Sequence, residues 1–89
     1  MQNATLTVNH EAGLHARPAA SFVKLAATFP CAITVRNLDR EKPAVNAKSM
    51  VSVLTQGVSK GHRIEIVATG EREADAIAAL TSLIQSNFA

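Results

Sequence analysis

The sequence predicts a small α+β domain in which a four-stranded antiparallel sheet carries three helices on one face. Three observations support this. The chain has 89 residues, which is enough for one domain spanning residues 1–89. Segments with the two-residue period of a strand alternate with segments that have the 3.6-residue period of a helix. The expected order, strand–helix–strand–strand–helix–strand–helix, fits a split βαβ arrangement, and no linker or repeat interrupts it.

The first strand is predicted over residues 4–9, because Leu6 and Val8 alternate there with polar residues. A loop containing Gly13 follows. Pro18 stands where the first turn of a helix tolerates a proline. The next apolar residues have the i, i+3, i+4, i+7 spacing of one helix face: Ala19, Phe22, Val23 and Ala26.

The second strand is predicted from the alternation around Ile33 and Val35, after Pro30 has ended the helix. Residues 37–41 are expected to form a polar turn. A third strand over residues 42–47 is expected at a sheet edge, since Pro43 cannot donate to a ladder.

The last three elements follow from equally local signals. A short helix is predicted over residues 49–56 and stops at Gly57. Gly61 opens a fourth strand, in which Ile64, Ile66 and Ala68 share one face and Arg63, Glu65 and Val67 the other. A final helix over residues 72–86 places an apolar stripe on one side: Ile77, Leu80, Ile84 and Phe88.

The amino-acid composition limits which kinds of protein this chain can be. The single cysteine, Cys31, excludes an internal disulfide, suits a reducing compartment and is expected to be a small buried residue at the start of a strand. The chain shows neither a signal peptide nor an apolar run long enough for a bilayer, so we expect a cytoplasmic protein without membrane insertion. The formal charge of +2 is too small to identify a partner.

The segment over residues 13–20, Gly-Leu-His-Ala-Arg-Pro-Ala-Ala, is the part of the sequence that points to chemistry. Pro18 places His15 just before the first helical turn, where unpaired main-chain N–H groups bind anions. Arg17 adds a guanidinium that pairs with phosphate oxygens, and Gly13 permits a positive φ angle. A lone histidine before a helix is more often a cap or surface residue, so spacing alone leaves both interpretations open.

This segment resembles the HPr phosphocarriers of the bacterial phosphoenolpyruvate-dependent sugar phosphotransferase system. A second matching block is Ala-Lys-Ser-Met over residues 47–50, followed by Gly57, and the element order agrees along almost the whole chain. The resemblance implies an HPr-like open-faced β-sandwich. It also implies that His15 accepts a phosphoryl group on Nδ1 from phosphorylated enzyme I and donates it to sugar-specific enzyme IIA proteins or domains, with Arg17 as the active-site arginine. The chain would then be a carrier that needs no cofactor or metal and acts as a monomer, rather than an enzyme with turnover of its own.

Ser49 has two interpretations. Its position predicts a helix N-cap, whose hydroxyl accepts from a main-chain N–H. The family also implies regulatory phosphorylation of the matching serine by an ATP-dependent HPr kinase/phosphorylase, with transcriptional regulators as further partners. A phosphate at a helix N-terminus is electrostatically well placed, so the local physics allows both.

The short helix over residues 49–56 carries more apolar residues than one buried face requires. Either all of them belong to the core, or, as the family implies, Met50 and Val51 form an exposed docking patch near His15. Polar or small residues would border that patch: Ala20, Lys24, Lys48 and Thr55.

One departure from the family lies between the second and third strands. Many relatives have a tight glycine-containing hairpin there, whereas this chain has the longer, glycine-free run of residues 36–42. We expect a local change that leaves the chemistry intact and the extent of the third strand open. His10 and His62 are interpreted as ordinary surface residues, because neither joins a metal-ligand cluster in the sequence.

Three other functions are weighed against the carrier. RNA-recognition domains share the topology but stack bases on sheet aromatics, and this chain has no Tyr, no Trp and no aromatic residue in a predicted strand. For a hydrolase that uses His15 as a base, the chain offers no evident nucleophile elbow or metal-ligand set. Purely regulatory HPr-like proteins lack the active-site histidine, which is present here.

Overall fold

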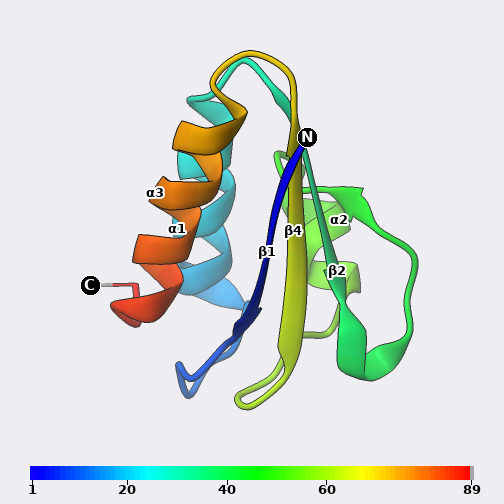
Figure 1. The fold of residues 1–89 in the computed structure, drawn as a ribbon. Helices are drawn as coiled ribbons and strands as arrows, with labels where there is room; N and C mark the ends of the chain where they lie inside the picture. The colour runs from blue at the N-terminus through cyan, green and yellow to red at the C-terminus, as the bar shows by residue number, and fades with distance from the viewer. Residues whose placement is uncertain (89) are drawn as a thin grey trace.

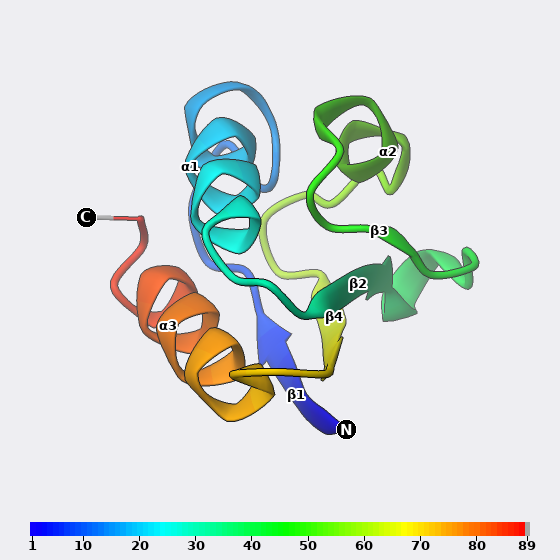
Figure 2. The same ribbon diagram turned by 90° about the horizontal axis from the view of Figure 1, so that it is seen from above.

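Four strands form one antiparallel sheet, and three helices cover one of its faces, as Figures 1 and 2 show. The computed structural model describes residues 1–88. The sheet has the order β1-β4-β2-β3. The elements are β1 (Gln2–Thr7), α1 (Ala16–Ala27), β2 (Ala32–Asn37), the 3₁₀ helix η1 (Leu38–Arg40), β3 (Val45–Asn46), α2 (Met50–Thr55), β4 (Arg63–Thr69) and α3 (Glu73–Gln85). The predicted open-faced sandwich is therefore confirmed.

The core lies between the helices and the inner face of the sheet. Alternation along β2 and β4 turns the even-numbered apolar residues of β4 and the odd-numbered residues of β2 inward, and the helices add one face each. The side chains with no exposed surface include Phe22, Leu80, Ile64, Ile66 and Val53. Cys31 is a free, buried cysteine just before β2, as predicted.

β1 begins and ends two residues earlier than the alternation predicts. It pairs with β4 from Gln2 opposite Ala68 to Thr7 opposite Arg63. Val8 then leaves the ladder, because its N–H donates to the His62 carbonyl and its carbonyl accepts from the Gly61 N–H. The buried Val8 side chain thus belongs to a junction between two loops rather than to a strand.

The β2–β3 connection differs most from the prediction. Asn37 is the last residue of β2 and is fully buried, so it is not part of a polar surface turn. The chain then makes one turn of 3₁₀ helix and reverses at Glu41, which has a φ of 51° without being glycine. β3 is only two residues long, at the edge of the sheet, because Pro43 has no N–H for the ladder and its carbonyl accepts from Gln56 Nε2 instead.

The helix ends follow the predicted signals within one to three residues. α1 ends at Ala27 with Thr28 as C-cap, ahead of Pro30. α2 begins after the N-cap Ser49 and ends before Gln56 and Gly57. Beyond α3, Phe88 has a φ of 64° and folds back, half-buried against the core. No helix in residues 1–88 combines the length and apolar character that crossing a bilayer requires.

Candidate functional site

The chain approaches α1 through a tightly packed loop. Gly13 has a φ of 61°, and a Cβ built on it would lie 2.2 Å from the Val58 carbonyl oxygen. Its N–H donates to the His10 carbonyl at 2.9 Å, and the next N–H, of Leu14, donates to the Val58 carbonyl at 3.0 Å. Only glycine fits here without strain, and the backbone that leads to residue 15 is held from both sides.

His15 is the N-cap of α1. Its φ and ψ of −128° and 161° are extended, its side chain makes no capping hydrogen bond, and the residue is exposed. An N-cap of this kind leaves the first helical N–H groups, those of Ala16 and Arg17, without a partner inside the helix. A negatively charged group on the imidazole would therefore meet main-chain donors and the positive end of the helix.

Pro18 and Arg17 complete the first turn of α1. Pro18 is buried, and its missing N–H leaves no unpaired donor at that position. Arg17 is exposed two residues after the histidine, and within residues 1–88 its guanidinium makes no ion pair. The start of the helix thus combines an exposed imidazole, main-chain donors and an exposed cation, which is the arrangement predicted from residues 13–20.

α1 and α2 lie side by side (Figure 2), and the hydrogen bonds at their ends show that they run in opposite directions. At one end Val58, just after α2, holds Leu14 just before α1. At the other end Lys48, just before α2, donates from Nζ to the Phe29 carbonyl just after α1, at 2.6 Å. The twelve residues of α1 place these ends about 18 Å apart. The structure therefore does not bring Lys48 next to His15.

Ser49 is the N-cap of α2, as predicted: its hydroxyl accepts from the Ser52 N–H at 3.3 Å. The residue is half-buried. It lies at the end of α2 that is farther from His15, since α2 runs from the Lys48 end toward the Val58 end.

The surface of α2 is only partly core. Val53 is fully buried and Met50 is half-buried against the core, whereas Val51 is 74% exposed and Leu54 is 38% exposed. The interpretation that all four residues are core is therefore wrong. We call Met50, Val51 and Leu54 the apolar patch; Leu54 was not among the docking residues that the sequence predicted.

Of the other predicted docking residues, three lie on the two helices and Lys48 lies just before α2. Ala20 and Lys24 are exposed on α1, and Thr55 is exposed at the end of α2. Lys42 was not predicted to belong to this surface, yet its Nζ donates to the Thr55 carbonyl. This contact places a cation at the C-terminal end of α2, where it complements the partial negative charge of the helix.

The interpretation of His62 as an ordinary surface residue is wrong. His62 is half-buried, and its Nδ1 lies 3.1 Å from Ser59 N and 3.1 Å from Asn37 Nδ2. Asn37 could have been predicted to be buried, because it continues the inward alternation of Ile33 and Val35. The contact to His62 could not, since it joins residues 25 positions apart.

His10 also has a local role. Its Nδ1 accepts from the Ala12 N–H at 3.1 Å, and its ring packs edge-on against Phe88 with centroids 5.7 Å apart. The end of the chain that follows α3 is in this way attached to the loop that precedes His15.

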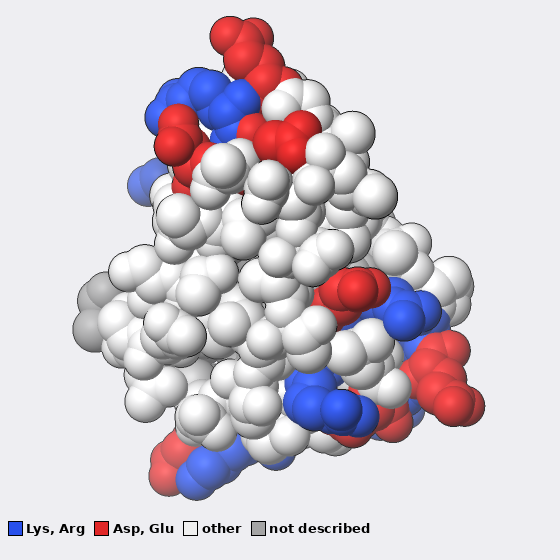
Figure 3. All heavy atoms as spheres, viewed as in Figure 1, with Lys and Arg blue, Asp and Glu red and all other residues white. Residues whose placement is uncertain are grey.

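Two hollows of the described surface lie away from the start of α1. A hollow of about 440 Å³ runs along β2 and β3, and its lining residues come from positions 30–34 and 44–48 rather than from the start of α1. Within residues 1–88, His, Cys, Asp and Glu side chains form no group of three that could hold a metal ion. Figure 3 shows one face of the molecule, on which charged side chains gather at the top, the lower right and the bottom, with uncharged surface between them.

Comparisons with known proteins agree on one family. The model of the PTS HPr component phosphorylation site matches residues 2–86. The chain is 44% identical over 84 residues to a multiphosphoryl transfer protein of Haemophilus influenzae, covering 94% of this chain but 17% of that protein. It is 36% identical over 83 residues to the phosphocarrier protein HPr of Pseudomonas putida, covering 93% of this chain and 90% of that one. The crystal structure of HPr from Thermoanaerobacter tengcongensis has a TM-score of 0.93 at 41% identity, covering 99% of this chain and 96% of that one.

Proposed function

The chain belongs to the HPr family of phosphocarriers of the phosphotransferase system, and from this premise we propose that His15 is the residue that carries the phosphoryl group. The observation that supports this most directly is the state of His15 itself. It is an exposed imidazole at the N-terminus of a twelve-residue helix, with no side-chain capping bond that would have to break before reaction.

The proposed reaction is a transfer between two imidazoles. The lone pair of the unprotonated Nδ1 of His15 attacks the phosphorus of a phosphohistidine on enzyme I. The N–P bond on the donor breaks, and its electron pair returns to the donor nitrogen. His15 keeps its proton on Nε2 throughout. Transfer onward to an enzyme IIA protein repeats the step with His15 as the leaving group, so the phosphoryl group is passed on and His15 returns to its starting state.

Arg17 and the first amides of α1 would act on the phosphoryl oxygens. The Ala16 and Arg17 N–H groups lie at the positive end of the helix, and the Arg17 guanidinium stays charged at any relevant pH. Donors of this kind stabilise charge that develops during transfer. Because the site is open to solvent, their effect stays moderate, as a carrier that must also release its cargo requires.

We assign docking to the apolar patch with its neighbours on α1, Ala20 and Lys24. An exposed valine and a leucine beside a half-buried methionine form the kind of surface that several partners can share. Val51→Asp should therefore raise the KM for phosphorylated enzyme I by about tenfold, since each lost contact of 1–2 kcal/mol is worth about that factor, and leave kcat nearly constant. Asn9→Asp, at an exposed position outside both helices, is the matched control for the added charge. Equal KM values for the two variants would remove the patch from the docking surface.

Regulation at Ser49 is a second part of the proposal. Phosphorylation by an ATP-dependent kinase would replace a neutral cap by a dianion at the start of α2, on the helix that carries the apolar patch. Ser49→Asp imitates part of this charge and should slow phosphoryl acceptance several-fold without abolishing it. Ser49→Asn, which keeps a neutral cap, is the control. Unchanged kinetics in Ser49→Asp would leave Ser49 with a structural role alone.

The proposed carrier acts as a monomer in the cytoplasm, with enzyme I and enzyme IIA components as its partners. The decisive experiment incubates the chain with phosphoenolpyruvate and enzyme I and measures the intact mass at neutral pH. We expect the gain of one phosphoryl group that is labile in acid and absent in His15→Ala. The variant should keep its circular dichroism spectrum, since the exposed ring makes little packing contact. No gain in the wild-type chain with an active enzyme I would refute the proposal.

A further inference from the structure

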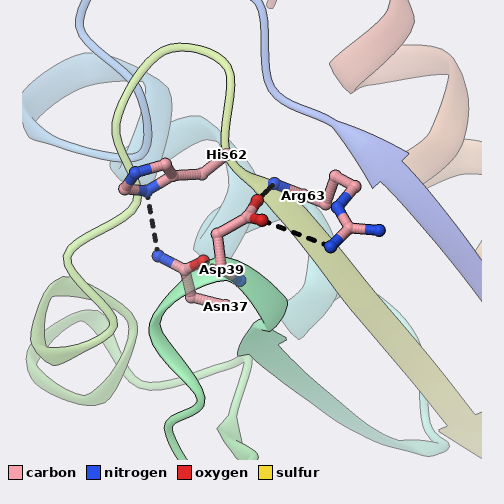
Figure 4. Close-up of polar contacts among 4 residues, drawn as sticks. All are labelled: Asn37, Asp39, His62 and Arg63. Atoms are coloured by element: carbon pink, nitrogen blue, oxygen red, sulfur yellow. Dashed lines mark hydrogen bonds and ion pairs between the residues drawn. The ribbon is translucent and has the colours of Figure 1, made fainter.

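His62 has a fixed hydrogen-bonding role. Its Nδ1 faces the main-chain N–H of Ser59 at 3.1 Å and the amide nitrogen of Asn37 at 3.1 Å, the second of which Figure 4 shows. A main-chain N–H can only donate, so Nδ1 must accept, and the imidazole carries its proton on Nε2. His62 is thus the acceptor that joins the loop over residues 57–62 to the end of β2.

Asn37 anchors this acceptor from inside the protein. It is fully buried, and its N–H donates to Gln56 Oε1 at 2.8 Å. Its Nδ2 lies 3.1 Å from the Gln56 carbonyl, while its Oδ1 accepts from the Asp39 N–H at 3.0 Å. In residues 1–88 no buried side-chain nitrogen or oxygen is left without a partner. A satisfied buried network of this kind holds its members in one arrangement.

The same loop holds the residue before His15. Val58, next to Ser59, accepts from the Leu14 N–H at 3.0 Å, and Gly13 lies so close to Val58 and Ser59 that no Cβ would fit between them. Leu14 is fully buried. The path from the interior to the imidazole of His15 therefore runs from Asn37 and His62 through Ser59 and Val58 to Leu14.

We propose that His62 is a positioning residue for phosphoryl transfer at His15. His62 acts through the 57–62 loop, and this proposal rests on the function proposed above for His15. A shift of the loop would move the Leu14 backbone and with it the N-cap geometry, so that the ring and the first amides of α1 no longer meet the phosphoryl group together. Small misplacements of reacting groups reduce rates strongly, whereas docking on the apolar patch would be unaffected. The effect should therefore appear in kcat rather than in KM.

The test compares two substitutions of the same residue. His62→Leu keeps much of the volume and removes the acceptor. His62→Asn keeps a carbonyl oxygen near the position of Nδ1 and cannot change its protonation state. Transfer from phosphorylated enzyme I is followed by rapid quench. Hydrogen exchange of the Leu14 amide is measured on the unphosphorylated proteins. Ile84→Val, in the buried face of α3, is the control for a general loss of stability.

We expect kcat to fall about tenfold in His62→Leu with the KM nearly constant, and His62→Asn to recover most of the rate. The Leu14 amide should exchange faster in His62→Leu than in His62→Asn or Ile84→Val. Equal kcat values for His62→Leu and the wild-type chain would overturn the positioning role while leaving His15 as the carrier. A loss of rate that Ile84→Val reproduces at a matched melting temperature would also overturn it. If the wild-type chain accepts no phosphoryl group, the proposed function fails first, and the role of His62 in transfer fails with it.

Discussion

α1 and α2 begin in the same way along the chain and differ in what the N-cap side chain does. Ser49 directs its hydroxyl back onto the Ser52 N–H and so satisfies a donor at the start of α2. His15 has the same extended backbone, yet its side chain makes no such bond, and the start of α1 keeps its donors open. The comparison indicates that α1 gives up part of its own stability at the end where we propose that the phosphoryl group binds.

The residues that precede α1 and α2 are also held in place by different contacts. Lys48, the residue before Ser49, is held by its side chain, which donates to the Phe29 carbonyl, and by its N–H, which donates to Asn46 Oδ1. The residues before His15 are fixed through the main chain and the close approach of Gly13 to Val58. At α1 the backbone is therefore held in place while the side chain of His15 makes no capping bond, which suits the carrier role proposed for this residue.

The strongest way to break this arrangement is Gly13→Ala. A Cβ there would lie 2.2 Å from the Val58 oxygen and would also require a positive φ, so we expect the free energy of unfolding to fall by about 3 kcal/mol. Gly61→Ala is the matched control, because Gly61 also has a positive φ but nothing lies within 4 Å of its added Cβ. Urea denaturation should show a loss of only about 1–2 kcal/mol for Gly61→Ala. Equal losses would mean that the close approach to Val58 contributes nothing.

A smaller change in stability is expected when the capping hydroxyl is removed at the start of α2 or introduced at the start of α1. Ser49→Ala should destabilise the protein by about 1 kcal/mol, whereas His15→Ser should stabilise it by about 0.5–1 kcal/mol because a hydroxyl can then accept from the first turn of α1. His15→Ser should at the same time lose phosphoryl acceptance on histidine completely. Thermal and urea denaturation measure the first effect and intact mass the second. If His15→Ser is no more stable than the wild-type chain, the start of α1 has given up no stability.

Most of this comparison was visible in the sequence. Pro18 predicted that His15 stands just before the first turn of the helix, and Ser49 was predicted as a cap from its residue type and position. The extent of β1 and β3 was predicted less well. Apolar alternation continues through Val8, although the ladder ends at Thr7. Of the predicted third strand, only Val45 and Asn46 form β3, while the Pro43 carbonyl accepts from Gln56 Nε2.

The contacts of Asn37 and His62 could not be predicted from local sequence patterns, for a different reason. Each residue type is ordinary in a surface turn, and only the fold brings the end of β2 to the start of β4. Apolar patterns with a period of 2 or 3.6 residues indicate which face of a strand or helix a side chain lies on. They carry no information on which polar group from a distant segment will stand opposite it.

At the start of β4 a carboxylate, rather than a hydroxyl, accepts from a main-chain N–H. Its contribution to stability can be measured through its dependence on pH. Asp39, in η1, accepts from the Arg63 N–H and pairs with the Arg63 guanidinium at 3.3 Å (Figure 4). The main-chain hydrogen bond is the largest cause that holds the pKa of Asp39 below its ordinary value of 3.8, and the guanidinium adds to it. A carboxyl whose pKa is lower in the folded chain stabilises the fold above the unfolded value, and this contribution is lost as the pH falls below 3.8 through the folded value.

Asp39→Asn should therefore remove part of the acid dependence of stability below pH 3.8 and have its largest effect at neutral pH. Arg63→Gln sharpens the test, because it deletes the guanidinium and keeps the main-chain N–H. If the main-chain bond dominates, NMR titration of the Asp39 carboxyl in Arg63→Gln should still give a pKa below the ordinary value. A return of that pKa to 3.8 would assign the effect to the guanidinium and would separate Asp39 from Ser49 as a cap of main-chain donors.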